Sequence, residues 1–298
     1  MLKITFLGTS GATPTKSRSL PSVSIEREGS VYLFDCGEGT QMQMMKYGIS
    51  PQKVKAIFIS HLHGDHVIGL AGLLRSMALN ARKDEISIFI PKGYESGVKA
   101  LISFDKAMFG YRIRVISIPH RVSKLLDERD FTISSFPLKH TLPSSGFAFR
   151  EKDRRRFVKS KYEKYNIKGT DFSKISKSGK LKTNGRTITL QDVTEVAKGR
   201  AVVYASDTRP SKSTVKASLN ADLLIHESSY MSSEKNLAQE RMHSTAAEAA
   251  EIAKEAHAER LVLTHISARY KDARPMEREA REIFQKAKVA NDGDVISL

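Results

Sequence analysis

The segment 60–66 reads Ser-His-Leu-His-Gly-Asp-His and contains four potential metal ligands. In an extended segment, residues two positions apart point to the same side, so His61 and His63 can bind one metal ion. Gly64 allows a turn that brings Asp65 and His66 toward a second ion. Three histidines and an aspartate at this spacing are hard to explain by structural roles, so they predict a metal site with two ions.

Three further candidate ligands follow apolar runs later in the chain, namely His140, Asp207 and His265. Side chains that emerge at strand ends converge at one edge of a sheet, so we expect these residues to complete the site. Imidazole and carboxylate donors without cysteine fit a catalytic centre better than a closed structural one. Zinc is the favoured ion, and manganese and iron are alternatives.

The elements that must position these residues are visible as short apolar runs. Strands are predicted at 2–7, 31–34, 54–59, 86–90, 113–118, 131–136, 201–205, 223–226 and 261–264. Helices are predicted at 67–79, 94–107, 246–258 and 275–288, with Ser244 and Thr245 before the third helix and Glu248 placed for a capping box. The sequence therefore predicts a mixed α/β chain.

The composition limits the class of protein. The 298 residues are 40% apolar and 28% charged, which is enough to bury a core and excludes a disordered tail. A net charge of +16 favours a polyanionic partner such as nucleic acid or anionic lipid. Cys36 is the single cysteine, which excludes a disulfide scaffold and predicts a reducing compartment. No apolar stretch has the roughly 18 residues of a membrane span, so we expect a soluble cytoplasmic protein.

Much of the charge is concentrated in one segment. Residues 150–186 hold 14 Lys or Arg and 4 Asp or Glu, including the triplet Arg154, Arg155 and Arg156. The segment has few aliphatic residues, and its flanks are ordinary globular sequence, so it reads as an insertion into a domain. Basic residues interleaved with aromatic ones are typical of nucleic-acid binding. The interleaved aromatic residues are Phe157, Tyr162, Tyr165 and Phe172.

Motifs along nearly the whole chain resemble the ribonuclease Z family of the metallo-β-lactamase superfamily. They are the sequences at 6–11 (Phe-Leu-Gly-Thr-Ser-Gly), 35–41 (Asp-Cys-Gly-Glu-Gly-Thr-Gln), 60–66, 206–208 (Ser-Asp-Thr), 226–229 (His-Glu-Ser-Ser) and 243–245 (His-Ser-Thr). The resemblance implies a single αββα domain over 1–298, with two sheets between outer helices and an inserted flexible arm at 150–190. It also implies an endoribonuclease that removes the 3′ trailer of precursor tRNA, leaving a tRNA 3′-hydroxyl and a trailer 5′-phosphate.

The resemblance further implies a role for each candidate site residue. One metal ion would be held by His61, His63 and His140, a second by Asp65, His66 and His265, and Asp207 would bridge the two. Asp65 would also act as general base. Glu227 and His243 would assist departure of the trailer, with His243 protonating the leaving oxygen. The simpler readings are that Glu227 orients a ligand and that His243 caps a helix.

Two elements are candidates for binding the RNA. The loop Pro14-Thr15-Lys16-Ser17-Arg18-Ser19 is similar to the family's PxKxRN loop near the cleavage point, and Lys16 and Arg18 keep its phosphate-binding chemistry. Ser19 replaces the usual Asn, which leaves open whether tRNA ending in CCA is cut or rejected. The insertion, with Arg154, Arg155 and Arg156, occupies the place of the family's tRNA-clamping arm but lacks the usual Gly-Pro pair. The family also implies a homodimer.

Two other classes of function compete with this interpretation. One is a metallo-β-lactamase-fold hydrolase of a small phosphodiester or thioester, which would not need the basic insertion or the Lys16 loop. The other is an RNA-binding protein without catalysis, which conflicts with an intact set of ligands.

Overall fold

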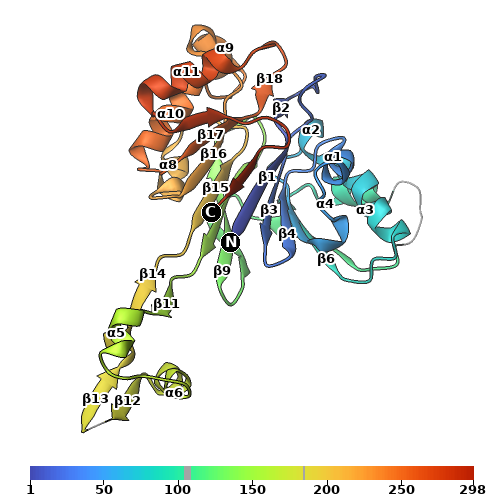
Figure 1. Ribbon diagram of the computed structural model, residues 1–298. Helices are drawn as coiled ribbons and strands as arrows, with labels where there is room; N and C mark the ends of the chain where they lie inside the picture. Colours follow the sequence, from blue (N-terminus) through green and yellow to red (C-terminus); the bar gives the residue numbers. More distant parts are fainter. Residues whose placement is uncertain (104–108, 184) are drawn as a thin grey trace. The chain divides into compact units, whose positions relative to one another are not determined.

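β-Branched and aromatic residues dominate the runs that pair into the first sheet. The computed structural model describes residues 1–103, 109–183 and 185–298, and within them this sheet has the strand order β20, β1, β3, β4, β5, β6, β7 (Figure 1). In that order the strands are Val295–Ser297, Leu2–Gly8, Ser22–Arg27, Ser30–Phe34, Val54–Phe58, Ile86–Pro91 and Ile113–Ile118. Strands β4 to β7 are parallel, so their carboxyl ends meet at one edge.

The second sheet has the order β19, β17, β16, β15, β10, β9, β8. In that order its strands are Ala287–Val289, Leu261–Thr264, Leu223–Glu227, Ala201–Ala205, Ser144–Glu151, Phe131–Leu138 and Ser123–Asp127. Strands β15, β16, β17 and β19 are parallel, and this again gathers carboxyl ends at one edge. The short strands β2 (Ser10–Gly11) and β18 (Ile266–Ser267) pair with each other beside these edges.

Aromatic side chains pack between the two sheets. The ring of Phe34 on β4 lies 5.7 Å from that of Phe147 on β10 and 6.0 Å from that of Tyr204 on β15. Phe58 on β5 contacts Phe147 as well, with ring centroids 5.5 Å apart. These large buried rings hold the inner faces together, since each removes a large apolar area from water.

Helices cover the outer faces of both sheets. Apolar residues of α1 (Thr40–Lys46), α3 (Gly69–Leu79) and α4 (Glu95–Ile102) share a buried cluster with the first sheet. Residues of α8 (Lys212–Ser218), α10 (Ala246–Glu255) and α11 (Arg274–Ile283) share another with the second sheet. Two sheets between outer helices form the predicted αββα fold, which is thereby confirmed. Two short elements, α2 (Gly64–Val67) and α9 (Lys235–Glu240), lie in the connections beyond the strand ends (Figure 1).

Helix boundaries differ from the sequence prediction in four places, and the helix predicted at 246–258 ends as α10 at Glu255. The helix predicted at 67–79 is divided into α2 and α3 around Ile68. The helix predicted at 94–107 is α4 as far as Ile102, and 104–107 lie outside the described residues. The helix predicted at 275–288 was too long. It ends at Ile283 because Phe284 takes extended backbone angles, and Ala287 and Val289 are then buried as part of β19.

The chain divides into two compact units. The first comprises Met1–Glu128, Thr132–Phe149 and Ala201–Leu298, and contains both sheets of the sandwich. The second comprises Arg129–Phe131 and Arg150–Arg200, and includes the segment predicted as an arm at 150–190. The backbone N–H of Glu151 donates to the carbonyl of Arg200 at 2.8 Å, so the two ends of the basic insertion (residues 150–200) are neighbours.

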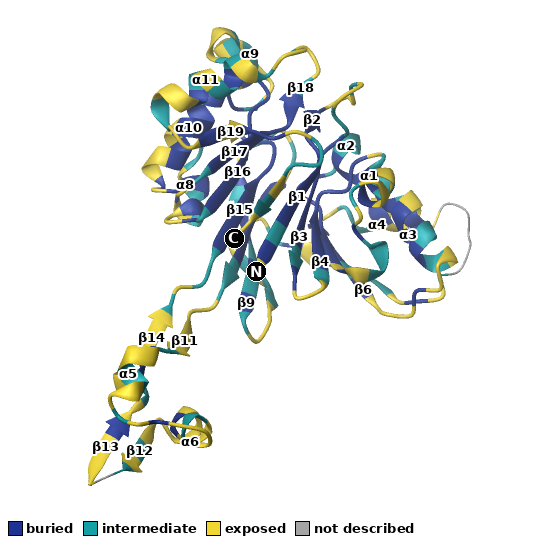
Figure 2. Ribbon diagram, viewed as in Figure 1, coloured by how far each residue is buried: buried dark blue, intermediate teal, exposed yellow. Residues whose placement is uncertain are grey.

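The second unit has a small core of its own. It contains the hairpin-like pairs β11 (Arg154–Phe157) with β14 (Thr194–Ala197) and β12 (Lys180–Thr183) with β13 (Arg186–Thr189), and the helices α5 (Lys159–Glu163), α6 (Asp171–Ser178) and α7 (Leu190–Val193). Ile167, Ile175, Ile188 and Val193 are buried together. Most other residues of this unit are exposed (Figure 2).

Candidate metal centre and active site

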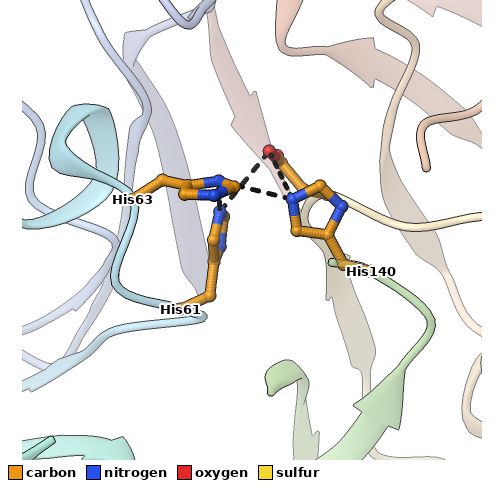
Figure 3. A group of neighbouring side chains, drawn as sticks. His61, His63 and His140 are labelled. Atoms are coloured by element: carbon orange, nitrogen blue, oxygen red, sulfur yellow. Dashed lines mark hydrogen bonds and ion pairs between the residues drawn. The ribbon is translucent and has the colours of Figure 1, made fainter. Parts of the chain in front are cut away.

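The first histidine group lies beyond strand β5. His61 and His63 follow that strand in extended backbone, and His140 follows β9. The three imidazoles point toward one another (Figure 3). The Nε2 atom of His61 is 3.0 Å from Nδ1 of His63, which is 3.4 Å from Nε2 of His140. His61 and His63 therefore point to the same side of the chain, as their spacing predicted.

The second group forms on the other side of the Gly64 turn. Asp65 and His66 begin α2, and His265 follows β17. The Nε2 atoms of His66 and His265 are 3.3 Å apart, and Asp65 Oδ2 is 3.4 Å from His66 Nε2 and 3.5 Å from His265 Nε2.

Asp207 lies between the two groups. It follows β15, and its two carboxylate oxygens face in different directions. Oδ2 is 3.5 Å from His61 Nε2 and 3.8 Å from His140 Nε2, whereas Oδ1 is 3.1 Å from His265 Nε2 and 3.5 Å from His66 Nε2. One carboxylate thus contributes an oxygen to each group, which is the geometry of a bridging ligand.

The donor atoms fit divalent metal ions. In each group the ligand atoms all lie within 4.8 Å of one another, and Asp207 Oδ1 is a buried oxygen without a hydrogen-bond donor. Several imidazole nitrogens converge there with their lone pairs, an arrangement that a cation stabilises. The donor set contains nitrogen and oxygen and no cysteine, as catalytic sites for zinc and related ions do.

The pKa shifts of the buried histidines agree with binding of divalent metal ions. Burial lowers the pKa of His61 well below its usual value, which keeps that imidazole neutral as a ligand must be. Burial also lowers the pKa of His66, but the carboxylates of Asp207 and Asp35 outweigh it and raise the pKa well above its usual value. The two carboxylates beside His66 therefore favour a positive charge at this place, which a bound metal ion would supply while the imidazole stays neutral.

Hydrogen bonds on the outer side of the rings orient two of the ligands. His140 Nδ1 donates to the carbonyl of Met242 at 2.9 Å, which leaves Nε2 as the inward-facing acceptor. His265 Nδ1 is 2.9 Å from Ser229 Oγ, whose own hydrogen goes to Glu227 Oε2 at 2.9 Å. Gly11 lies so close to the ring of His265 that an added Cβ would be 2.6 Å from it. The glycine allows this close approach.

His243 and Glu227 form a pair at the edge of the site. His243 Nδ1 is 2.8 Å from Glu227 Oε1. Burial lowers the pKa of His243, but the Glu227 carboxylate outweighs burial and raises the pKa to about 9. Glu227 itself is fully buried and accepts backbone N–H groups of Thr208, Ser229 and Ser244. It orients His243 and three loops and does not face solvent.

A cavity of about 1020 Å³ opens onto the candidate ligands. His63, Asp65, His140, Asp207, His243 and His265 line it together with residues of α9 and of the loop at 12–14. A nucleotide and its neighbours fit a space of this size. All six side chains are thus accessible to one substrate.

The loop at 14–19 places its two cations differently. Lys16 is exposed, whereas the guanidinium of Arg18 donates to Thr9 Oγ1 at 2.6 Å and to the carbonyl of Ala290 at 2.5 Å. Burial lowers the pKa of Arg18. Arg18 therefore ties the loop to the C-terminal segment, and Lys16 is the more exposed of the two cations.

In the second unit, Arg154, Arg155 and Arg156 are all exposed on β11. The interleaved aromatic residues, unlike these arginines, pack within the unit. The ring of Phe172 packs edge-on against Phe157 at 4.8 Å and Tyr162 at 5.0 Å, beside the small apolar core. These aromatic side chains hold the unit together, so the Lys and Arg side chains remain as its candidate RNA contacts.

Sequence reasoning missed the polar residues that support the ligands. Ser60 and Ser229 contact His61 and His265, but a single serine carries no spacing signal. Asp35 and Tyr204 were not assigned a role either. The available signal for Asp35 was its position directly after an apolar strand, the same signal that pointed to Asp207.

Comparison with known proteins identifies the family. The chain is 42% identical to the Ribonuclease Z of Archaeoglobus fulgidus over 298 residues, which cover 98% of this chain and 96% of the relative. It is 38% identical to the Ribonuclease Z of Methanothermobacter thermautotrophicus, with 98% and 95% covered. The chain belongs to the ribonuclease Z family. Residues 2–289 also match the family model described as anti-Pycsar protein Apyc1, so the chain belongs to the family of that model as well.

Solved structures agree with the family and the fold. Human tRNase Z, short form, superposes with a TM-score of 0.74 at 29% identity, covering 99% of this chain and 98% of the human chain. The metallo-β-lactamase fold protein YhfI of Bacillus subtilis gives a TM-score of 0.72 at 21% identity, with 99% and 98% covered, and it shares the fold. Among the described residues, no helix is both long and apolar enough to cross a membrane.

Proposed function

We propose that this enzyme removes the 3′ trailer from precursor tRNA, leaving a 3′-hydroxyl on the tRNA and a 5′-phosphate on the trailer. As a member of the ribonuclease Z family it is an endoribonuclease, a phosphodiester hydrolase. The observation that carries the proposal is Asp207, whose two oxygens face two separate histidine groups beside a substrate-sized cavity. The small-ester alternative is not favoured by these relatives.

We assign the metal ligands according to the two groups of side chains. His61, His63 and His140 would hold one ion, Asp65, His66 and His265 a second, and Asp207 would bridge them. When bound, two divalent ions, which we take to be zinc, lower the pKa of water and stabilise charge on the attacking and leaving oxygens.

Asp65 is the candidate general base. The surrounding histidines lower its pKa despite burial, so it is an ionised carboxylate that can accept a hydrogen bond from a water molecule and orient it. The backbone N–H of Ala12 donates to Asp65 Oδ2 at 2.9 Å and helps to fix that oxygen. The carboxylate also lines the cavity, so it is within reach of the substrate.

His243 is the candidate general acid. With Nδ1 bonded to Glu227, its other ring nitrogen is free to donate a proton to the leaving 3′ oxygen. Its raised pKa, about 9, keeps the ring protonated at neutral pH, as an acid requires. Glu227 acts through His243.

Substrate binding would use two basic surfaces. Lys16 is exposed on the loop whose Pro14 lines the cavity, and so we assign it to a phosphate near the cleaved bond. The basic insertion, with exposed Arg154, Arg155 and Arg156, is assigned to the tRNA body. A homodimer in the cytoplasm completes the proposal, and the buried, unpaired thiol of Cys36 supports a reducing compartment.

The test compares two substrates with and without chelator. The purified protein should cut a 3′-extended tRNA transcript at the trailer junction and hydrolyse bis(p-nitrophenyl) phosphate, and a chelator should abolish both activities. Product ends are mapped on precursors with and without an encoded CCA. Hydrolysis of the small ester with no cleavage of the precursor would favour the small-ester alternative. Binding of the precursor without any hydrolysis would favour an RNA-binding protein.

A further inference from the structure

The loop at 14–19 is anchored at its C-terminal end by one carboxylate from the far end of the chain. The backbone N–H of Ser19 donates to Asp292 Oδ2 at 2.6 Å. The same oxygen accepts the side-chain amide of Gln43 on α1 at 2.8 Å, and the hydroxyl of Thr9 donates to Oδ1 at 2.7 Å. Asp292 thus joins the chain before the loop, the chain after it and helix α1.

The guanidinium of Arg18 is held beside this carboxylate. It donates to Thr9 Oγ1 at 2.6 Å, to the carbonyl of Ala290 at 2.5 Å and to Asn291 Oδ1 at 3.1 Å. Thr9 is fully buried and gives its own hydrogen to Asp292, so its oxygen accepts from Arg18. The positive and the negative side chain therefore meet at one hydroxyl, and both fix the same end of the loop.

The tip of the loop is a closed turn. The backbone N–H of Thr15 donates to the carbonyl of Arg18 at 2.8 Å, and the Thr15 hydroxyl accepts the backbone N–H of Arg18 at 2.9 Å. Lys16 lies within this turn and is exposed. A turn with such internal hydrogen bonds moves as one piece. The direction in which Lys16 projects is therefore set by the contacts that hold Arg18 and Ser19.

The other end of the loop reaches the candidate active site. The backbone N–H of Ala12 donates to Asp65 Oδ2 at 2.9 Å, and Ala12 and Pro14 line the cavity. Asp292 does not line it. Asp292 can therefore affect a substrate in the cavity in two ways, by holding the loop or as a bare negative charge.

We propose that Asp292 is a positioning residue that holds the loop at 14–19 so that Lys16 meets a phosphate of the substrate. The inference rests on the proposed function and deepens it. The two ways of acting have opposite signs. A bare carboxylate repels a polyanion, so its removal would strengthen tRNA binding. An anchor of Lys16 favours binding, so its removal weakens it.

Asp292→Asn is the central test. The amide keeps the size of the side chain but replaces one accepting oxygen with an NH₂ donor, which opposes the hydrogens of Ser19, Gln43 and Thr9. We expect the KM for a 3′-extended tRNA to rise about tenfold, as for the loss of a hydrogen bond to a charged group. Hydrolysis of bis(p-nitrophenyl) phosphate should stay nearly unchanged, because this small ester does not need Lys16. Steady-state kinetics on both substrates measure the two effects.

Asp272→Asn is the matched control. Asp272 lines a small cavity of about 200 Å³ together with Ser17 and Arg18, and its hydrogen bonds go to Arg274. The variant removes the same charge beside the loop but none of the contacts that anchor it. Its KM for the precursor should stay the same or fall.

Two further variants connect the effect with Lys16. Lys16→Gln should itself raise the KM for the precursor. Adding Asp292→Asn to Lys16→Gln should change the KM by less than about twofold more, because the position of a missing cation no longer matters. Thr9→Val keeps the shape of a buried side chain but removes the hydroxyl between Asp292 and Arg18, so it should raise the KM in the same direction by a smaller factor.

The outcomes distinguish this inference from the proposed function. If Lys16→Gln raises the KM and Asp292→Asn leaves it unchanged or lowers it, the role of Asp292 is overturned and the proposed function stands. Effects of Asp292→Asn and Lys16→Gln that add in full also overturn it, since Asp292 then acts apart from Lys16. If the unaltered protein does not cut the precursor, or if Lys16→Gln leaves the KM unchanged, the proposed function or its assignment of Lys16 fails and the inference fails with it. Should Asp292→Asn not fold, Thr9→Val alone and combined with Lys16→Gln decides.

Discussion

Asp65 has two proposed roles, as a ligand and as the base. Its carboxylate lies within 3.5 Å of His66 and His265 and lines the cavity. Asp65→Ala should abolish cleavage of precursor tRNA and leave tRNA binding nearly unchanged, because it removes no RNA contact. Single-turnover cleavage and a gel-shift titration measure the two effects. Asp84→Ala, which removes an exposed carboxylate paired with Lys55, is the control and should cleave normally.

A general base contributes at least about 10²-fold, so Asp65→Ala should retain well under about a tenth of the original turnover. A variant that keeps more than that fraction would contradict the proposed role of Asp65. A variant that also loses tRNA binding would indicate that Asp65 contacts the RNA or supports the fold.

His243 can be separated from the ligands by the leaving group. His243→Ala should keep both metal ions, as measured by elemental analysis. It should slow the cleavage of precursor tRNA, because the ribose 3′ oxygen is a poor leaving group unless it receives a proton. The loss should be much smaller for bis(p-nitrophenyl) phosphate, whose phenolate leaves without one. An equal loss on both substrates would show that His243 acts only as a structural residue of its loop.

The site residues that sequence could predict are those with a spacing signal or a place directly after an apolar run. His61, His63, Asp65 and His66 were recognisable because four donors fall within one short segment. Asp35 also follows an apolar strand, but that position does not show what it contacts. Its partners His66 and Tyr204 are distant in the chain, and contacts of that kind exist only after folding. The role of Arg18 was likewise hidden, because its partners include Ala290 near the other end of the chain.

At the scale of elements, the strand ends explain why the site forms. His61 follows β5, Asp207 follows β15 and His265 follows β17, and these strands belong to parallel parts of the two sheets. Ser145 on β10 donates to the carbonyl of Ser60 at 2.9 Å, which links the ligand segment to the second sheet. The apolar runs predicted these strands well because they are buried on both faces. The half-buried strand β8 and the two small strand pairs of the basic insertion escaped prediction, since they lack an apolar run. The buried strands β3 and β10 escaped as well, because serine and charged residues interrupt their apolar residues.

Strand β11 allows a prediction about the two faces of the basic insertion. Side chains alternate along a strand, so Arg154 and Arg156 share one face, and Arg155 shares the other with Phe157, which packs on the unit's core. The double variant Arg154→Gln, Arg156→Gln should weaken tRNA binding more than Arg155→Gln does. Its log–log salt slope should fall by about 0.7 to 0.9 for each phosphate that the variant no longer neutralises.

Filter binding across a salt series measures both quantities. Lys212→Gln, on α8 of the first unit, serves as the charge-matched control for Arg155→Gln, and we expect it to keep the salt slope. Equal effects of the Arg155 variant and the double variant would contradict the assignment of one face. If neither variant changes tRNA binding or the salt slope, β11 is not part of the RNA-binding surface.

At the scale of the whole molecule, the two units should be functionally separable. The ends of the basic insertion are hydrogen-bonded neighbours through Glu151 and Arg200, so a short glycine-serine turn can replace 152–198. The shortened protein should hydrolyse bis(p-nitrophenyl) phosphate almost normally, since every candidate ligand lies in the first unit. Its KM for precursor tRNA should rise strongly. An unaltered KM and salt slope would show that the basic insertion does not bind the substrate.

Mixing two inactive variants tests whether the basic insertion of one subunit serves the active site of another. One variant carries Asp65→Ala and keeps its basic insertion; the other keeps the candidate ligands but lacks 152–198. In a homodimer that works across subunits, each mixed dimer has one intact insertion and one intact site that act together. Co-refolding equal amounts should therefore restore cleavage of precursor tRNA to a substantial fraction of the unaltered rate, while either variant alone stays inactive.

Mixed dimers are isolated with two different affinity tags, and their rate is compared with that of the separate variants added together. If tagged mixed dimers form and remain inactive, each subunit binds and cuts its own tRNA. If no mixed dimers form and sedimentation shows a monomer, the proposed homodimer is wrong, and the basic insertion must act on the site of its own chain.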